Sequence, residues 1–126
     1  MDENDISYQI RSAIFTVYNA LGPGLLESVY ETVLTYVLTK NGLDVKQQVK
    51  LPVVFEGITL DAGYRIDLLI NDLVIIEVKS VETLAPVHHK QVLTYLKLSG
   101  LRLGLLVNFN SSDISQSIWR KVNGLF

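Results

Sequence analysis

The sequence predicts an α/β protein built around a mixed sheet, with residues 1–126 forming a single domain. Three observations carry this prediction. Apolar residues recur at helical spacing up to residue 40, the period then changes to two, and one more helical stretch separates two strongly apolar strands. A chain of 126 residues that is 48% hydrophobic and 19% charged suits one compact globular domain.

Two helices are predicted before the first strand. Asn4 or Asp5 caps the first helix and Gly22-Pro23 ends it, whereas Gly24 opens the second and Asn41-Gly42 ends it. The apolar stripes that define them are Ile6, Ile10, Ala13, Ile14, Val17 and Leu21 in the first helix, and Leu26, Tyr30, Val33, Leu34, Val37 and Leu38 in the second.

The next segment alternates between apolar and polar residues. Val45 to Leu51 predicts a strand with one wet face, and Pro52 makes it an edge strand or a bulged one because proline lacks an N–H. Glu56-Gly57 predicts a tight turn that leads back into a strand from Ile58 to Asp61.

The stretch from Ala62 to Val81 predicts a hairpin of two strands buried on both faces, with its turn at Asn71-Asp72. A two-residue turn would place Asp67 and Glu77 on opposite faces. One additional residue reverses this, because the pleat has a period of two. If the two acids share a site, we therefore expect a three-residue loop or a bulge, with Asp67 facing the same way as Glu77.

A third helix is predicted to begin near Thr83 to Pro86, run to Leu98 and end at Ser99-Gly100. The strand from Leu101 to Phe109 follows, so we expect a right-handed crossover between parallel strands. The tail from Asp113 to Arg120 fits a loop or a last short strand, with Trp119 packed on the core.

The strongest chemical signal is the pair formed by Asp67 and the run Glu77-Val78-Lys79. Charged groups in such apolar strands are costly unless they are paired or bind a metal. Two carboxylates on neighbouring strands suit Mg²⁺, and Lys79 could steady an attacking water or developing negative charge. The alternative is a buried ion network that serves structure alone.

Other candidate residues are weaker by themselves. Glu27 lies in the first turn of the second helix, where an acid favours the helix dipole, and Tyr30 has a simple interpretation as core. His88, Gln91 and Tyr95 form one helical stripe, which also fits a solvated face with Tyr95 half-buried. The sequence contains no glycine-rich phosphate loop.

Composition limits the class of protein further. The absence of cysteine excludes disulfides and thiolate zinc sites. The acidic N-terminus does not resemble a signal peptide, and no apolar run approaches the roughly 18 residues of a membrane span, so we expect a soluble cytoplasmic protein without a membrane partner. The net charge of −2 weighs mildly against strong non-specific nucleic-acid binding, and the apolar share leaves room for a homodimer.

Taken together, these residues resemble the PD-(D/E)XK nuclease superfamily, and closely its GxxExxY branch. The motifs that carry the resemblance are Gly24, Glu27 and Tyr30; YRID ending at Asp67; Glu77-Val78-Lys79; HHKQVLTYL with Gln91 and Tyr95; and GLLVNFN from Gly104 to Asn110. The one departure is Ile66, which stands where the superfamily's name has a proline.

The resemblance implies a restriction-endonuclease-like αβββαβ core with an extra N-terminal helix. It also implies that Glu27, Asp67, Glu77 and the Val78 carbonyl converge on Mg²⁺ or Mn²⁺. Lys79 would then position the water, while Gln91 and Tyr95 would line the site or touch the phosphate; His88 stays undecided.

Three hypotheses follow. The first is a metal-dependent nuclease, with DNA favoured over RNA as its nucleic-acid partner. The second is a catalytically inactive module that kept the fold and binds nucleic acid or a protein. The third is a nuclease subunit that needs a partner to capture its substrate.

Overall fold

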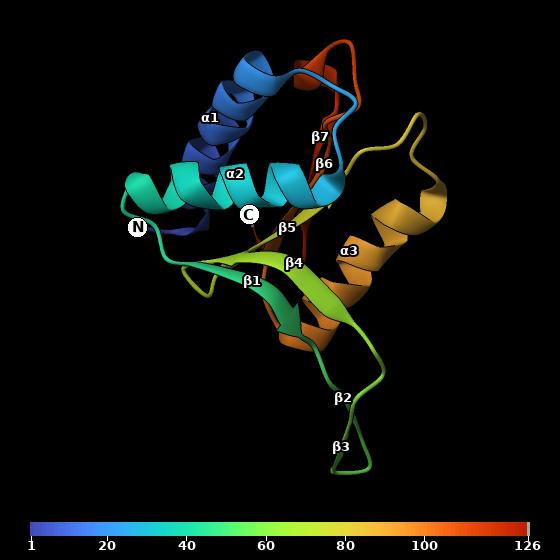
Figure 1. Ribbon diagram of the computed structural model, residues 1–126. Helices are drawn as coiled ribbons and strands as arrows, with labels where there is room; N and C mark the ends of the chain where they lie inside the picture. Colours follow the sequence, from blue (N-terminus) through green and yellow to red (C-terminus); the bar gives the residue numbers. More distant parts are fainter. Residues whose placement is uncertain (126) are drawn as a thin grey trace.

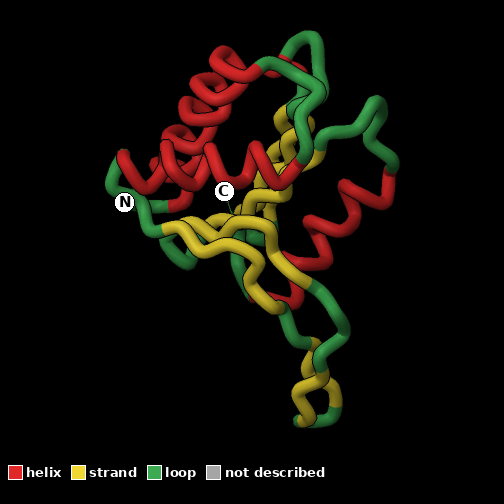
Figure 2. Tube along the Cα trace, in the orientation of Figure 1, coloured by secondary structure: helices red, strands yellow, loops and turns green. Residues whose placement is uncertain are grey.

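The computed structural model, which describes residues 1–125, has two helices on one face of a five-stranded mixed sheet and one helix on the other (Figures 1 and 2). The sheet order is β1-β4-β5-β6-β7, and all neighbours are antiparallel except β5 and β6. The elements are α1 (Glu3–Leu21), α2 (Glu27–Lys40), β1 (Val45–Lys50), β2 (Val53–Phe55), β3 (Ile58–Leu60), β4 (Arg65–Ile70), β5 (Val74–Lys79), α3 (Pro86–Ser99), β6 (Leu103–Asn108), a 3₁₀ turn at Ile114–Gln116 and β7 (Ile118–Val122). This confirms the predicted class, with α1 preceding an αβββαβ core.

The two N-terminal helices begin at other residues than the sequence suggested. Asp2, rather than Asn4 or Asp5, caps α1: its side chain accepts from the Asp5 N–H, and the Asp5 side chain accepts from the Asp2 N–H. α2 begins at Glu27, because Gly24 has a φ of +95°, which lies outside the helical region. Leu26 therefore precedes the helix and is 73% exposed, so its assignment to the apolar stripe was wrong.

β1 is an edge strand, as Pro52 indicated, and it pairs with β4. The turn at Glu56-Gly57 is also confirmed, since both residues have positive φ and join β2 to β3. These two short strands form a separate two-stranded sheet, which projects from the body of the protein (Figure 1).

The hairpin of β4 and β5 has the three-residue loop that a shared site requires. Ile70 pairs with Val74 and Leu68 pairs with Ile76, so the loop comprises residues 71–73. Continuing this register by one residue sets Asp67 opposite Glu77. The two side chains therefore face the same side of the sheet, as predicted for a shared site.

The C-terminal half follows the predicted order. β5 and β6 are parallel on either side of α3, and the tail forms the last strand, β7, after the 3₁₀ turn at Ile114–Gln116, which was not predicted. Trp119 lies half-buried on β7 with its ring edge-on to His89, at 5.2 Å between centroids, and belongs to neither core cluster.

The sheet separates two hydrophobic clusters, so β4 and β5 are buried on both faces as expected. Leu68 and Ile76 face the larger cluster under α1 and α2, whereas Leu69 and Ile75 face a smaller one under α3. The C-terminal end of β5 lies between these two layers.

Within residues 1–125, none of the helices has the length and apolar character needed to cross a membrane.

Candidate active site

Asp67 and Glu77 lie where the regular pairing of β4 with β5 ends. The Asp67 N–H donates to Glu77 Oε1 at 3.0 Å, and the Val78 N–H donates to Asp67 Oδ2 at 2.9 Å. Side-chain oxygens thus replace the carbonyl acceptors that a continuing ladder would supply. The backbone N–H groups of Asp67 and Val78 thus hold the two acids that the hairpin pattern predicted.

This arrangement places Glu77 in an unfavourable setting for a negative charge. Its side chain is 3% exposed, and burial together with the neighbouring Asp67 carboxylate raises its pKa to about 9. Lys79, two residues along β5, opposes the shift only in part. The buried Glu77 and the half-buried Asp67 therefore place more carboxyl groups than cations at this position.

Glu27 reaches the same end of the sheet from α2. Its Oε1 accepts from the Ser80 N–H at 3.2 Å, directly after Lys79, and the Ser80 hydroxyl donates to the Leu25 carbonyl at 2.6 Å. These contacts join the start of α2 to the end of β5. Glu27 is therefore half-buried beside the strand that carries Glu77, and it does not point away into solvent.

Tyr30 explains why the chain holds Glu27 there. Its ring is fully buried and stacks on Phe109 at 4.3 Å between centroids. Its hydroxyl donates to the Gly22 carbonyl and accepts from the Leu25 N–H at 3.2 Å. Tyr30 thus fastens the loop before α2, and Gly24 supplies the positive φ that this loop needs.

Glu31, one turn after Glu27, is an acid that the sequence analysis missed. Burial, and then the Asp67 charge, raise its pKa to about 7. Gln48 Nε2 donates to Glu31 Oε1 at 2.8 Å and lies 3.4 Å from Asp67 Oδ1, so one amide links both acids. The available signal was its i+4 spacing from Glu27, which puts both on one face of α2.

Gln48 was predicted on the wet face of the first strand and is indeed exposed, but its backbone is unusual. It stands opposite Asp67 in the register of β1 with β4, where the regular pairing is interrupted, and its φ is +51°. A non-glycine residue in this region marks local strain, and strained residues cluster at functional sites.

Lys79 and Gln91 border one groove on the α3 side of the sheet. The groove has a volume of about 450 Å³, and its other lining residues are Tyr64, Val87, His88, Lys90 and Thr94. Lys79, two residues beyond Glu77, and Lys90 give this groove two cationic groups. Such a surface suits an anionic ligand lying along α3.

The predicted stripe on α3 forms a connected pair. Gln91 Nε2 donates to the Tyr95 hydroxyl at 2.8 Å, and Tyr95 is 3% exposed. Burial and the nearby Glu77 charge raise the pKa of Tyr95 above its ordinary value. His88 instead accepts from the Ala85 N–H through Nδ1 at 3.1 Å, which caps the start of α3.

The donor set fits a hard cation in its chemistry. Carboxylate oxygens are the preferred ligands of Mg²⁺ and Mn²⁺, and a backbone N–H fixes one oxygen each of Glu27, Asp67 and Glu77, as ligating carboxylates usually require. The second oxygen of Glu27 makes no hydrogen bond to residues 1–125. Among those same residues, no three acidic, histidine or cysteine side chains already form a cation cage.

A mixed sheet between helices, with paired acids and a lysine at the end of its central hairpin, is the architecture of a class of nucleases. The sequence matches the PD-(D/E)XK nuclease superfamily over residues 4–121, and the chain belongs to that superfamily.

The fold is also similar to the crystal structure of a protein named SSO0001, with a TM-score of 0.57 and 24% sequence identity. The similarity covers 79% of this chain and 52% of that one, so this chain spans about half of its length. The likeness supports the fold alone. No curated protein matches the sequence.

Proposed function

We propose that this protein is a metal-dependent nuclease that hydrolyses phosphodiester bonds with a metal-activated water. The observation that carries the proposal is the pair formed by the buried Glu77 and the half-buried Asp67, with Lys79 two residues beyond. Burying two neighbouring carboxylates destabilises a fold unless a cation binds between them. Such a site is retained where it performs chemistry.

In this proposal Glu27, Asp67, Glu77 and the Val78 carbonyl hold Mg²⁺ or Mn²⁺, and Glu31 adds a further carboxylate at its edge. When bound, the cation would polarise a phosphoryl oxygen and lower the pKa of water. Lys79 positions the attacking water beside the acids, and Gln91, held by Tyr95, contacts the phosphate from α3.

The substrate in this proposal is nucleic acid, with DNA ahead of RNA, and it lies in the groove that Lys79 and Lys90 border. Lys50 and Arg65, paired across β1 and β4, extend the positive charge beyond Asp67. We also assign the chain to the GxxExxY branch, supported by the separate roles of Gly24, Glu27 and Tyr30, and treat residues 1–126 as one nuclease-like domain.

A second candidate function is a binding module that kept the fold without catalysis. It is favoured by the lack of a ready-made cation cage within residues 1–125 and by the net charge of −2. In that case the acids and Lys79 would serve only as a structural network.

The test is a thermal-shift titration with Mg²⁺ and Mn²⁺ of the wild type, Glu77→Ala, Glu31→Gln and the control Glu82→Gln, which removes an exposed acid. We expect metal to raise the melting temperature of the wild type and the control but not of Glu77→Ala. Glu31→Gln should need about tenfold more metal, the usual effect of losing a supporting carboxylate.

Nuclease assays on plasmid, single-stranded DNA and RNA then follow in the same metals. Cleavage by the wild type that is lost in Glu77→Ala and in Lys79→Ala establishes the activity. If neither metal changes the melting temperature of the wild type at high millimolar concentration, the proposal is overturned in favour of the binding module.

A further inference from the structure

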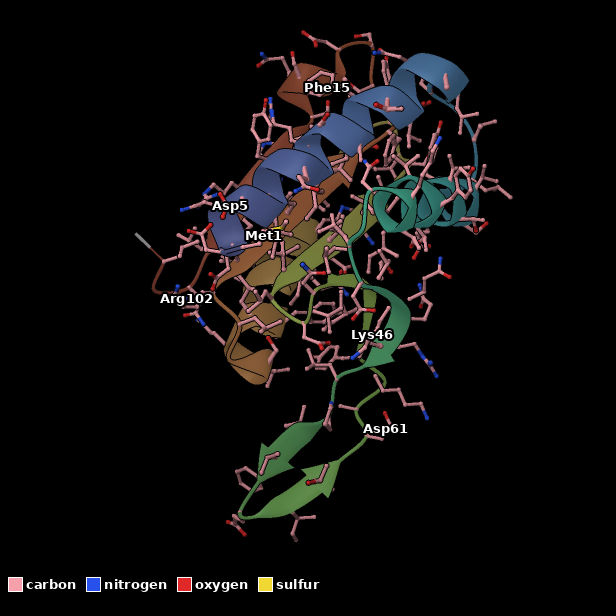
Figure 3. The ribbon with its side chains drawn as sticks, turned by 90° about the vertical axis from the view of Figure 1, so that its left-hand side faces the viewer. Met1, Asp5, Phe15, Lys46, Asp61 and Arg102 are labelled. Atoms are coloured by element: carbon pink, nitrogen blue, oxygen red, sulfur yellow. The ribbon has the colours of Figure 1, made fainter. Side chains whose placement is uncertain are left out.

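The hairpin of β2 and β3 projects from the protein (Figures 1 and 3), and most of its apolar side chains are exposed. Neither hydrophobic cluster of the described chain includes any of its residues. Val54 is 65% exposed, Phe55 63% and Ile58 60%. An isolated two-stranded hairpin is at best marginally stable in water, so a projection of this kind needs something to cover it.

The apolar side chains gather on one side of the hairpin. Phe55 pairs with Ile58 and Val53 pairs with Leu60, and side chains two residues apart share a face. These four residues therefore form one surface, the apolar hairpin face. The other face carries Val54 opposite Thr59. A contiguous surface of four apolar side chains is typical of an interaction site.

The charges at the two ends of the hairpin have opposite signs. Glu56 lies exposed at the tip, whereas Lys50 and Arg65 stand directly opposite each other at the base, both exposed. Like charges in such a cross-strand pair repel each other. An anionic group placed over the base would therefore be favourable, and the tip itself carries such a group.

The composition of the hairpin disfavours nucleic acid as the partner that binds over the apolar hairpin face. No lysine or arginine occurs from residue 51 to residue 64, and the charged residues there are Glu56 and Asp61. A nucleic acid drawn along this surface would meet negative charge without the cations that phosphate contacts require. Three of the four side chains of the apolar hairpin face are aliphatic, which are poor partners for base stacking.

We propose that the apolar hairpin face is the contact between two copies of this chain, stacked antiparallel about a two-fold axis. In this arrangement the same four residues of each copy meet, as a two-fold interface requires. Each Glu56 lies over Lys50 and Arg65 of the other copy. Parallel stacking would instead bring tip to tip and base to base, where like charges repel.

The size of this contact sets its strength. Four side chains from each copy provide less than the roughly 800 Å² per partner of a standard stable interface. We therefore expect a dimer that dissociates on dilution through the micromolar range. Arg65 precedes Asp67 by two residues, so dimerisation would bring the tip of one copy beside the candidate active site of the other.

The experiment is sedimentation velocity of the full chain over a range of concentrations, with circular dichroism to check folding. The wild type is expected to pass from monomer to dimer as concentration rises, and Phe55→Asp to stay monomeric throughout. Val54→Asp, the same change on the opposite face of the same hairpin, is the matched control and should associate as the wild type does.

The charge arrangement is tested separately. Glu56→Lys should weaken association about tenfold or more, because the tip then meets base cations of the same sign. Combining it with Lys50→Glu and Arg65→Glu reverses both ends and should restore dimerisation. A wild type that is monomeric at the highest concentration, or a dimer that survives Phe55→Asp, overturns the proposal. The face would instead belong to nucleic acid if Phe55→Asp lost oligonucleotide binding under conditions where the wild type itself is monomeric.

Discussion

At the scale of single residues, the main feature of the candidate site is that its carboxyl groups outnumber the cationic side chains beside them. Glu77 accepts from the Asp67 N–H, Asp67 accepts from the Val78 N–H, and Gln48 joins Asp67 to Glu31. Each carboxyl group therefore has a fixed position, and burial together with the Asp67 charge raises the pKa of Glu77 to about 9 in the metal-free chain. Positions fixed in advance of binding are what a cation site needs.

The first prediction concerns the stability of the metal-free protein as pH changes. The pKa of Glu77 is raised from 4.5 to about 9, so between these values the folded chain keeps a proton that the unfolded chain has lost. The free energy of unfolding therefore falls as pH rises through this window, on the order of a few kcal/mol in total. Above pH 7 the fall belongs to Glu77, because the raised pKa of Glu31 is about 7.

Urea unfolding in EDTA, repeated at several pH values, measures this fall. Glu77→Gln keeps the size of the side chain and removes its titration, so its stability should change much less between pH 7 and 9. Glu82→Gln should follow the wild type. If the unfolding free energies of the wild type and Glu77→Gln change equally between pH 7 and 9, the pKa of Glu77 is not raised in the folded protein.

At the scale of elements, the decisive contact is between the start of α2 and the end of β5. Glu27 and Ser80 bridge them, and Tyr30 anchors the loop that leads into the helix. Tyr30 thus fixes the position of the helix that carries Glu27 and Glu31, although it is not one of the candidate metal ligands.

The second prediction is that Tyr30→Phe loosens this contact while preserving the core. The variant keeps the ring that stacks on Phe109 and loses both hydrogen bonds of the hydroxyl, which should cost about 1–2 kcal/mol of unfolding free energy. Metal should also stabilise the variant less, because Glu27 is held less firmly.

Urea unfolding and the Mg²⁺ titration measure the two effects. Tyr36→Phe is the control, since Tyr36 lies on the same helix and is 66% exposed. Equal stability of both variants would show that the Tyr30 hydroxyl does not fasten the loop.

At the scale of the whole molecule, a net charge of −2 must be reconciled with an anionic substrate. The positive charge that matters is local: Lys79 and Lys90 border the groove along α3, and Lys50 and Arg65 face each other beyond Asp67. We therefore expect nucleic-acid binding that rests on a few phosphate contacts and is modest at physiological salt.

The third prediction is that Lys90→Gln lowers the salt dependence of binding. Removing one phosphate contact should reduce the slope of log affinity against log salt by about 1, with a similar loss on any base sequence. Fluorescence anisotropy of a labelled oligonucleotide in EDTA measures it. Lys40→Gln, at the far end of α2, should leave the slope unchanged, and an unchanged slope in Lys90→Gln would remove the groove from the binding surface.

Much of this protein was determined by the sequence through short-range rules. The period of the apolar residues predicted the α/β class and the helices, and Pro52 predicted that β1 is an edge strand or a bulged one. Pleat parity predicted that the β4–β5 hairpin has a three-residue loop or a bulge if Asp67 and Glu77 share a site, and the three-residue loop is the one observed. The i+4 spacing of Gln91 and Tyr95 likewise predicted their contact.

Only the tertiary structure decided the features that depend on contacts between distant segments. Gln48 joins Glu31 to Asp67 because an edge strand, a helix and a central strand meet there, and no local pattern encodes that meeting. β2 and β3 lie outside the main sheet, because β1 pairs with β4 and the two short strands pair with each other. Periodicity states which residues seek burial, but competition among segments for the same partners decides which surfaces are covered and which, like the apolar hairpin face, stay open.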